Sequence, residues 1–113
     1  MSDHIRIRTA PGTWVVRAGG AVLGESRHVQ ELTEGSHRPV HYFPREDIAM
    51  AMLDPTLRTS TCPWKGQANY FSIVTPDGTL DNAVWTYEAP IPECAAIAGH
   101  LAFYADRVTI ERV

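Results

Sequence analysis

The sequence predicts a mainly β protein, built of compact antiparallel β-sheets with two short helices and folded on itself so that its edge strands are protected. Short stretches rich in β-branched and aromatic residues recur along the chain, and glycine or proline turns separate them. Helical patterns are too few for the regular alternation of strands and helices that a doubly wound α/β fold needs.

The amino-terminal third is predicted to be a β-meander. Polar and apolar residues alternate over its first strand, and the extended pattern resumes after the Pro11-Gly12 turn. Gly19-Gly20 lies between two further extended stretches, at a spacing that suits a hairpin whose turn needs a positive φ. Strands are expected at residues 4–8, 14–17, 21–23, 29–32 and 39–43.

Two short helices are predicted on either side of a second hairpin. Pro44 suits a helix start, Glu46 and Asp47 fall in the first turn, where the helix dipole favours acidic side chains, and Asp54-Pro55 ends the pattern. These signals predict a helix at residues 45–53. The other expected elements are strands at 67–74 and 83–87 around a turn at 75–78, a short helix at 92–99, and a final hairpin of 101–104 with 107–112.

Length and composition predict one soluble globular domain over residues 1–113, since 44% of the residues are hydrophobic and 20% are charged. The amino terminus lacks the apolar run of a signal peptide, and no stretch is long enough to span a membrane, so we expect a cytoplasmic protein without a membrane partner. Nine scattered arginines are interleaved with thirteen acidic residues, and this pattern makes nucleic acid an unexpected partner.

The segment Thr61-Cys62-Pro63-Trp64-Lys65-Gly66 is the most distinctive in the chain, because it places a cysteine three residues before the only lysine. A nearby cation raises the thiolate fraction of a cysteine, so Cys62 is a candidate nucleophile, redox thiol or ligand contact, with Lys65 as its partner or as an anion-binding group. The alternative is that Cys62 is a small buried residue and Lys65 a solvated cation. We expect Cys62 and Cys94 to be free thiols, since no secretory signal precedes them.

Glu34 and His37 are candidate general acid/base groups, although exposed residues of these types are often only solvated. His41 would share a face with His37 about 13 Å away along an extended chain, too far for both to ligate one metal ion at roughly 2 Å. No cofactor or metal site is therefore expected. Four aromatic residues are candidate ligand-binding groups: Tyr42, Trp64, Trp85 and Tyr87. Trp85 and Tyr87 lie two apart on one predicted strand, and core packing is their alternative role.

Several segments, taken in order, resemble the motifs of a small bacterial and fungal family, the domain-of-unknown-function family 427. They are Glu34 with Ser36-His37, Pro39-Val40-His41-Tyr42-Phe43-Pro44 with Asp47, Cys62-Pro63-Trp64-Lys65-Gly66, and Trp85-Thr86-Tyr87-Glu88-Ala89-Pro90. The resemblance runs from Pro11-Gly12 to Phe103-Tyr104, and the cysteine segment is its most specific part. The family commonly has tyrosine where this chain has Trp64 and often has tyrosine where it has His41. Both residues of this chain also carry a ring.

The resemblance implies a compact Mss4-like β fold, of the β-tent or barrel-like kind that also includes methionine sulfoxide reductases. Such folds often hold zinc with two C-x-x-C knuckles, and this chain has no C-x-x-C motif. The family is sometimes labelled a nucleotidyltransferase. That label implies metal-assisted nucleotide transfer, but the sequence lacks the paired catalytic acids and the Gly-Ser loop that the reaction needs.

Three functions remain open from the sequence. The first is binding of a small ligand, for which anionic metabolites are the class to test, in a pocket formed by the cysteine segment and neighbouring aromatic residues. The second is a thiol enzyme in which Cys62 attacks an electrophile while Glu34 or His37 moves protons. The third is a protein-interaction or self-association module that uses exposed aromatic residues.

Overall fold

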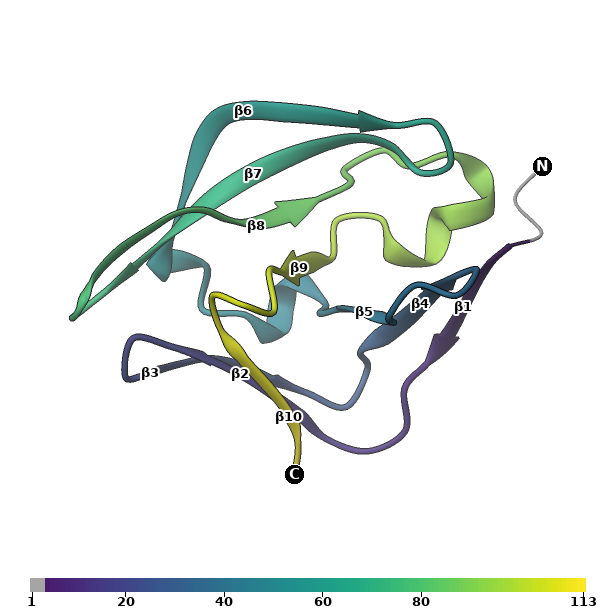
Figure 1. Cartoon of the computed structure of the whole chain (residues 1–113). Coiled ribbons are helices and arrows are strands. Elements are labelled where there is room, and N and C mark those ends of the chain that lie inside the picture. Colours follow the sequence, from purple (N-terminus) through teal and green to yellow (C-terminus); the bar gives the residue numbers. More distant parts are fainter. Residues whose placement is uncertain (1–3) are drawn as a thin grey trace.

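The computed structural model describes residues 4–113, and all the named strands pair antiparallel in three sheets. The mainly β prediction is therefore confirmed. One sheet has the order β1-β4-β5, the second β10-β2-β3 and the third β6-β7-β8-β9. Figure 1 shows β6, β7 and β8 of the third sheet in the upper part and β2, β3 and β10 in the lower part. The strands are β1 (Ile5–Thr9), β2 (Trp14–Ala18), β3 (Ala21–Ser26), β4 (Gln30–Glu34), β5 (Val40–Tyr42), β6 (Leu53–Cys62), β7 (Gly66–Thr75), β8 (Gly78–Thr86), β9 (Leu101–Phe103) and β10 (Thr109–Arg112).

Two predicted hairpins are confirmed. Strands β2 and β3 pair around Gly19 and Gly20, whose φ angles of +53° and +78° are the positive values that this turn requires. Strands β7 and β8 pair next to their turn with Thr75 opposite Gly78.

Two other sequence predictions are wrong in their pairing, and one strand was missed. Strand β1 pairs with β4 instead of β2, so the amino-terminal third is no meander. Strand β9 pairs with β8 while β10 pairs with β2, so the last two strands belong to different sheets. The ten-residue β6 was not predicted, because it is an edge strand in which most side chains are exposed and no clear alternation marks it.

The helical segments are short 3₁₀ turns. Instead of one helix over residues 45–53, the chain forms η1 (Arg45–Asp47) and η2 (Met50–Met52). Ile48 interrupts the helix because its backbone is extended and forms a bridge to Gly24. The segment predicted as a helix at 92–99 forms η3 (Pro92–Ile97), and Gly99 follows it with a φ of +70°. Within the described part of the chain, no helix is long and apolar enough to cross a membrane.

The buried side chains form two clusters of different chemistry. The first, which we call the phenylalanine core, has no polar member: Ala10, Val16, Ala18, Leu23, Val29, Phe43, Ile48, Leu53, Phe71, Ile73, Ala83, Val84, Leu101 and Phe103. The second, the tyrosine core, is smaller and contains three phenols and a thiol: Leu32, Tyr42, Ala68, Tyr70, Tyr87, Cys94, Ile97 and Ala102.

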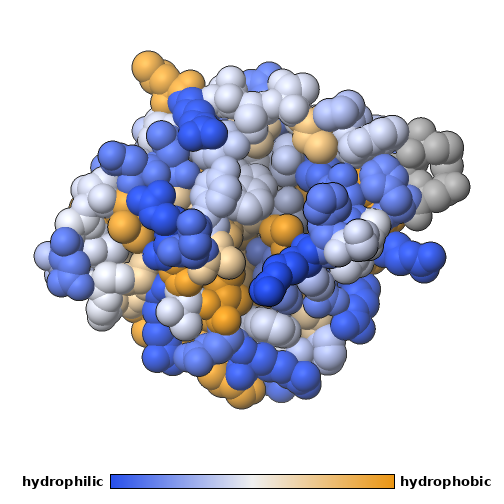
Figure 2. Space-filling model, viewed as in Figure 1, coloured by the Kyte–Doolittle hydropathy of each residue, from blue (hydrophilic) through white to orange (hydrophobic). Residues whose placement is uncertain are grey.

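A pair of backbone hydrogen bonds joins two of the sheets beside both cores. The Phe43 N–H donates to the Leu101 carbonyl and the Leu101 N–H donates to the Phe43 carbonyl, each at 2.8 Å. This bridge holds the end of β5 against the start of β9, which lie near the middle of the molecule in Figure 1. Hydrophilic side chains cover most of the face seen in that view, and hydrophobic ones show between them near its centre (Figure 2).

Candidate functional site

The cysteine segment forms the tight turn between β6 and β7. Cys62 pairs with Gly66 across the hairpin, and the Lys65 N–H donates to the Cys62 carbonyl at 3.1 Å. Gly66 has a φ of +123°, which a residue with a side chain adopts only with strain. The Lys65 carbonyl accepts a hydrogen bond from the Ile91 N–H at 2.9 Å, so the turn is anchored to the segment before η3. Hydrogen bonds at both its N–H and its carbonyl thus fix the backbone of Lys65.

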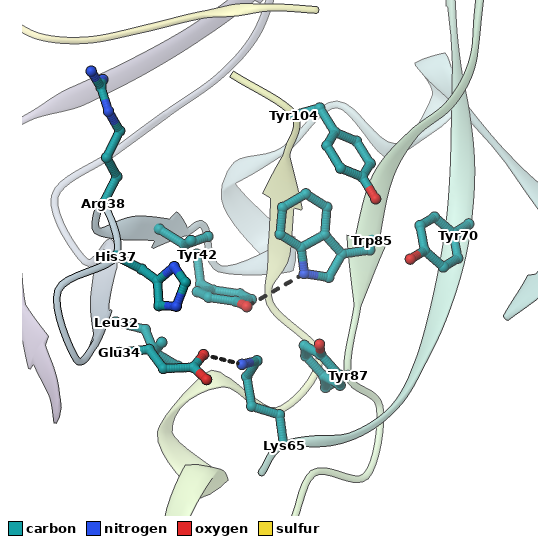
Figure 3. A pocket seen from close by; sticks show the side chains of 11 residues that line it. Leu32, Glu34, His37, Arg38, Tyr42, Lys65, Tyr70, Trp85, Tyr87 and Tyr104 are labelled. Atoms are coloured by element: carbon teal, nitrogen blue, oxygen red, sulfur yellow. Dashed lines mark hydrogen bonds and ion pairs between the residues drawn. The ribbon is translucent and has the colours of Figure 1, made fainter. Parts of the chain in front are cut away.

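Lys65 forms an ion pair with Glu34, the last residue of β4. Its Nζ lies 2.7 Å from Glu34 Oε1, and only 12% of the Lys65 side chain and 25% of the Glu34 side chain are exposed. The second carboxylate oxygen of Glu34 lies 3.6 Å from His4 Nε2. Figure 3 shows the two charged groups meeting at the lower end of a cavity.

Both members of this pair stay charged at neutral pH. The hydrogen bond from Lys65 lowers the pKa of Glu34; burial opposes this effect, and the charges of Lys65, His4 and His37 add to it. Burial alone would lower the pKa of Lys65, but the hydrogen bond to Glu34 and the neighbouring Cys62 thiol outweigh burial and raise it. A carboxylate with a lowered pKa is a poor general acid near neutrality, so Glu34 does not suit the proton-donating role.

Aromatic side chains from three strands form the wall facing the ion pair. Tyr42 comes from β5, Trp85 from β8 and Tyr70 from β7. The Trp85 indole N–H donates to the Tyr42 hydroxyl at 3.4 Å, drawn as the upper dashed line in Figure 3, and the two rings meet edge to face. Trp85 also packs against Tyr104, with ring centroids 4.6 Å apart.

Two of the phenols in this wall are held in their neutral form. Burial raises the pKa of Tyr42 and of Tyr87 well above the ordinary value for a phenol. Their O–H groups are therefore hydrogen-bond donors over the whole physiological pH range. Because Tyr42 accepts from Trp85 through its oxygen, its own proton is free for another partner.

These groups enclose a cavity of about 270 Å³, which we call the tyrosine cavity. Its lining combines one ion pair, two further basic side chains, five aromatic rings and two aliphatic residues (Figure 3). The lining residues are Leu32, Glu34, His37, Arg38, Val40, Tyr42, Lys65, Tyr70, Trp85, Tyr87 and Tyr104.

The structure brings six of the eight candidate residues of the sequence analysis to this cavity: Glu34, His37, Tyr42, Lys65, Trp85 and Tyr87. Cys62 is half-buried and lies beside Lys65, but it is not among the lining residues. Trp64 lies outside the lining as well; its ring packs edge-on against His4 at 4.9 Å and is 38% exposed. Of the cysteine segment, only Lys65 reaches the cavity. Cys62 and Cys94 are both free thiols, as predicted.

Sequence reasoning missed three polar or aromatic lining residues: Arg38, Tyr70 and Tyr104. Neither tyrosine was among the candidate residues. A usable signal was present, because each is next to a phenylalanine in an extended segment, and neighbouring strand residues point to opposite faces. In residues 4–113 no group of three or more histidine, cysteine, aspartate or glutamate side chains is arranged to hold a metal ion.

Comparison with known families agrees with these motifs. The model of the family described as Domain of unknown function (DUF427) matches residues 6–113, nearly the whole chain, so the protein belongs to this family. The resemblance found in the sequence is thereby confirmed, while the Mss4-like likeness stays a prediction. No curated protein matches the chain.

Proposed function

We propose that this member of the DUF427 family binds a small anionic ligand in the tyrosine cavity. The observation that carries the proposal is an excess of hydrogen-bond donors around the buried Lys65–Glu34 pair. The Lys65 ammonium has three N–H donors, and the short bond to Glu34 uses one of them. The carboxylate of Glu34 is in turn the one acidic group of the lining, and it already has a cationic partner.

The phenol groups add to this excess of donors. Tyr42 and Tyr87 both line the cavity and are neutral, so each carries an O–H donor. A ligand that enters the cavity therefore meets N–H and O–H groups whose unmet need is for acceptors. A carboxylate or phosphate oxygen, which only accepts, fits that need, and charge-assisted hydrogen bonds of this kind are the stronger ones.

The charges of the lining favour the same ligand. The chain as a whole has a net charge of −3, yet Lys65 and Arg38 in the lining outnumber Glu34. Rings of tyrosine and tryptophan can also form a cage for a quaternary ammonium ion. Such a cation would meet the ammonium of Lys65 inside the cage, and Glu34 is already paired, so the cationic alternative is disfavoured.

The geometry gives less support to the other two functions predicted from the sequence. Cys62 lies outside the lining of the cavity, so its thiol is not presented to a molecule bound there. Thiol catalysis by Cys62 and self-association through exposed aromatic residues therefore stay predictions. Alkylation of Cys62 by iodoacetamide as a function of pH tests the first, and light scattering tests the second.

The proposal is tested by NMR titration of the ¹⁵N-labelled protein with acetate, inorganic phosphate and tetramethylammonium. The indole N–H signal of Trp85 reports on the cavity, while that of Trp64, outside it, is an internal reference. We expect at least one of the anions to shift the Trp85 signal saturably and tetramethylammonium to leave it in place. Lys65→Gln should weaken anion binding about tenfold, the loss of one charge-assisted contact.

Matched variants separate a binding role from a structural one. Lys65→Arg keeps the charge and should retain most of the affinity. Arg17→Gln is the control, because it removes an exposed cation that pairs with Glu111 within the β10-β2-β3 sheet. The proposal is wrong if wild-type protein binds neither anion, if it binds tetramethylammonium in their place, or if Lys65→Gln and Arg17→Gln affect the anion equally.

A further inference from the structure

A second, larger cavity adjoins the tyrosine cavity. Its volume is about 460 Å³, and we call it the Trp14 cavity. Four residues line both cavities: Arg38, Val40, Trp85 and Tyr104. The two spaces therefore adjoin at these shared side chains, at a place where strands of all three sheets come together. The residues that line only the Trp14 cavity are Trp14, Pro39, His41, Phe103, Ala105 and Ile110.

The Trp14 cavity differs from the tyrosine cavity in chemistry. Its walls are mostly flat rings, since Trp14 stacks on His41 with ring centroids 4.4 Å apart and an interplanar angle of 30°. Burial lowers the pKa of His41, and the nearby Glu31 carboxylate does not offset this effect, so the imidazole is neutral at pH 7. The surface presented to a guest is aromatic and uncharged except for Arg38, which suits a flat apolar ring.

Arg38 lies at the boundary between the two chemistries. Its side chain is exposed and forms no ion pair within residues 4–113. In Figure 3 it extends from the chain beside His37, away from the Glu34–Lys65 pair. A guanidinium in this place adds a second cation to the mouth of the tyrosine cavity, and it can stack over a planar group as well as hydrogen-bond an oxyanion.

We infer that the ligand has two parts, a flat aromatic ring that occupies the Trp14 cavity and a carboxylate that reaches the donors of the tyrosine cavity. This inference rests on the proposed anion binding and adds the class of ligand, an aryl carboxylate. Each cavity alone lies near or within the range of about 300–1,000 Å³ that is typical of small-molecule sites. The two together accommodate a fused ring and its acidic group.

The experiment compares two carboxylates by NMR titration. Acetate carries a methyl group on its carboxylate, and 2-naphthoate carries a fused aromatic ring in its place. We expect 2-naphthoate to bind at least about tenfold more tightly than acetate, because the ring removes apolar surface from water in the Trp14 cavity. Ala105→Trp places an indole at an exposed position in the lining of that cavity. It should weaken 2-naphthoate about tenfold and change the affinity for acetate by less than about twofold.

A matched control and a second readout keep the result interpretable. Ala96→Trp adds the same side chain at an exposed position of η3, outside both cavities, and should leave both affinities unchanged. In the wild-type complex, naphthyl protons should show nuclear Overhauser contacts to the Ile110 methyl groups, which line only the Trp14 cavity.

The outcomes separate the two proposals. If 2-naphthoate binds no more tightly than acetate, or equally well to Ala105→Trp and wild type, the two-part ligand is excluded while anion binding stands. If neither carboxylate binds the wild-type protein while phosphate does, the inference alone fails. If Lys65→Gln leaves the binding of both carboxylates unaffected, or no anion binds the wild-type protein, the proposed function fails and the inference with it. Loss of 2-naphthoate in Ala105→Trp together with retained acetate supports both.

Discussion

The phenylalanine core and the tyrosine core include aromatic residues that are adjacent in the sequence. Tyr42 is next to Phe43, and Tyr70 is next to Phe71; in each pair the phenylalanine belongs to the first core and the tyrosine to the second. Phe103 and Tyr104 repeat the arrangement, with Tyr104 packed against the tyrosine core. Because consecutive residues of an extended segment point to opposite faces, the phenylalanine and the tyrosine of each pair face different clusters.

This difference assigns stability and binding to different faces of one scaffold. Phe43 is fully buried and meets Phe103 edge to face at 5.8 Å, in a cluster without polar groups. Tyr42 is as deeply buried, but its hydroxyl accepts a hydrogen bond from Trp85 at the cavity wall. Buried hydroxyls are stable only with such partners, so the phenols gather where the cavity and the indole supply them.

The largest expected effect is on the phenylalanine side. Phe43→Ala should lower the free energy of unfolding by about 3–5 kcal/mol, because it removes a ring at the contact between β5 and β9 and leaves a void. Urea denaturation followed by tryptophan fluorescence measures this. If Phe43→Ala lowers the free energy of unfolding by less than the exposed substitution Val22→Ala, the phenylalanine core is not the main source of stability.

Adding a hydroxyl group to the phenylalanine core and removing one from the tyrosine core should lower the free energy of unfolding by unequal amounts. Phe43→Tyr should cost about 1–3 kcal/mol, since it buries a hydroxyl without a partner. Tyr42→Phe should cost about 1 kcal/mol or less, the loss of one weak hydrogen bond from Trp85, and should also weaken anion binding. The same denaturation assay and the acetate titration report both. Equal stability losses for the two variants would contradict the division between the cores.

The smallest expected effect is on the pH dependence of stability. The pKa of Glu34 is lowered in the folded protein from its ordinary value of 4.5, so the unfolded chain binds more protons below that pH. Its stabilising contribution, about 0.5 kcal/mol for a half-buried pair that solvent still reaches, is present above pH 4.5 and is lost as the pH falls through the lowered pKa.

Glu34→Gln should therefore be less sensitive to acid than wild type when urea denaturation at about pH 7 and about pH 3 is compared. Glu88→Gln is the matched control, because Glu88 pairs with Arg45 at the exposed surface away from the cavity. If the free energy of unfolding of Glu34→Gln and of wild type falls by the same amount between these two pH values, the ion pair with Lys65 does not lower the pKa of Glu34.

The local elements that sequence reasoning found were those with strong local signals. Gly19-Gly20 and the turn at 75–78 predicted two hairpins correctly, because turn chemistry acts over a few residues. The failures concern partners distant in the chain. Nothing local shows that β1 pairs with β4, that β10 pairs with β2, or that the polar edge strand β6 continues to Cys62.

The candidate site shows the same limit. Lys65, Glu34 and Trp85 were found from their residue types and motifs, but their meeting depends on strand register. Next to its turn, β7 pairs Thr75 with Gly78, and this register would bring Tyr70 opposite Ala83. An irregularity between Phe71 and Ile73 shifts the pairing so that Tyr70 lies opposite Trp85 in the cavity wall.

By itself, then, the amino-acid sequence determined the β class, the two hairpins, the family and most of the residues at the cavity, since alternation, turn residues and motifs are local properties. Only the tertiary structure decided that Lys65 meets Glu34, that Cys62 and Trp64 lie outside the lining, and that a second cavity adjoins the first. Those facts depend on which strands pair and in what register, and long-range pairing is settled by the burial of the whole chain rather than by any one segment.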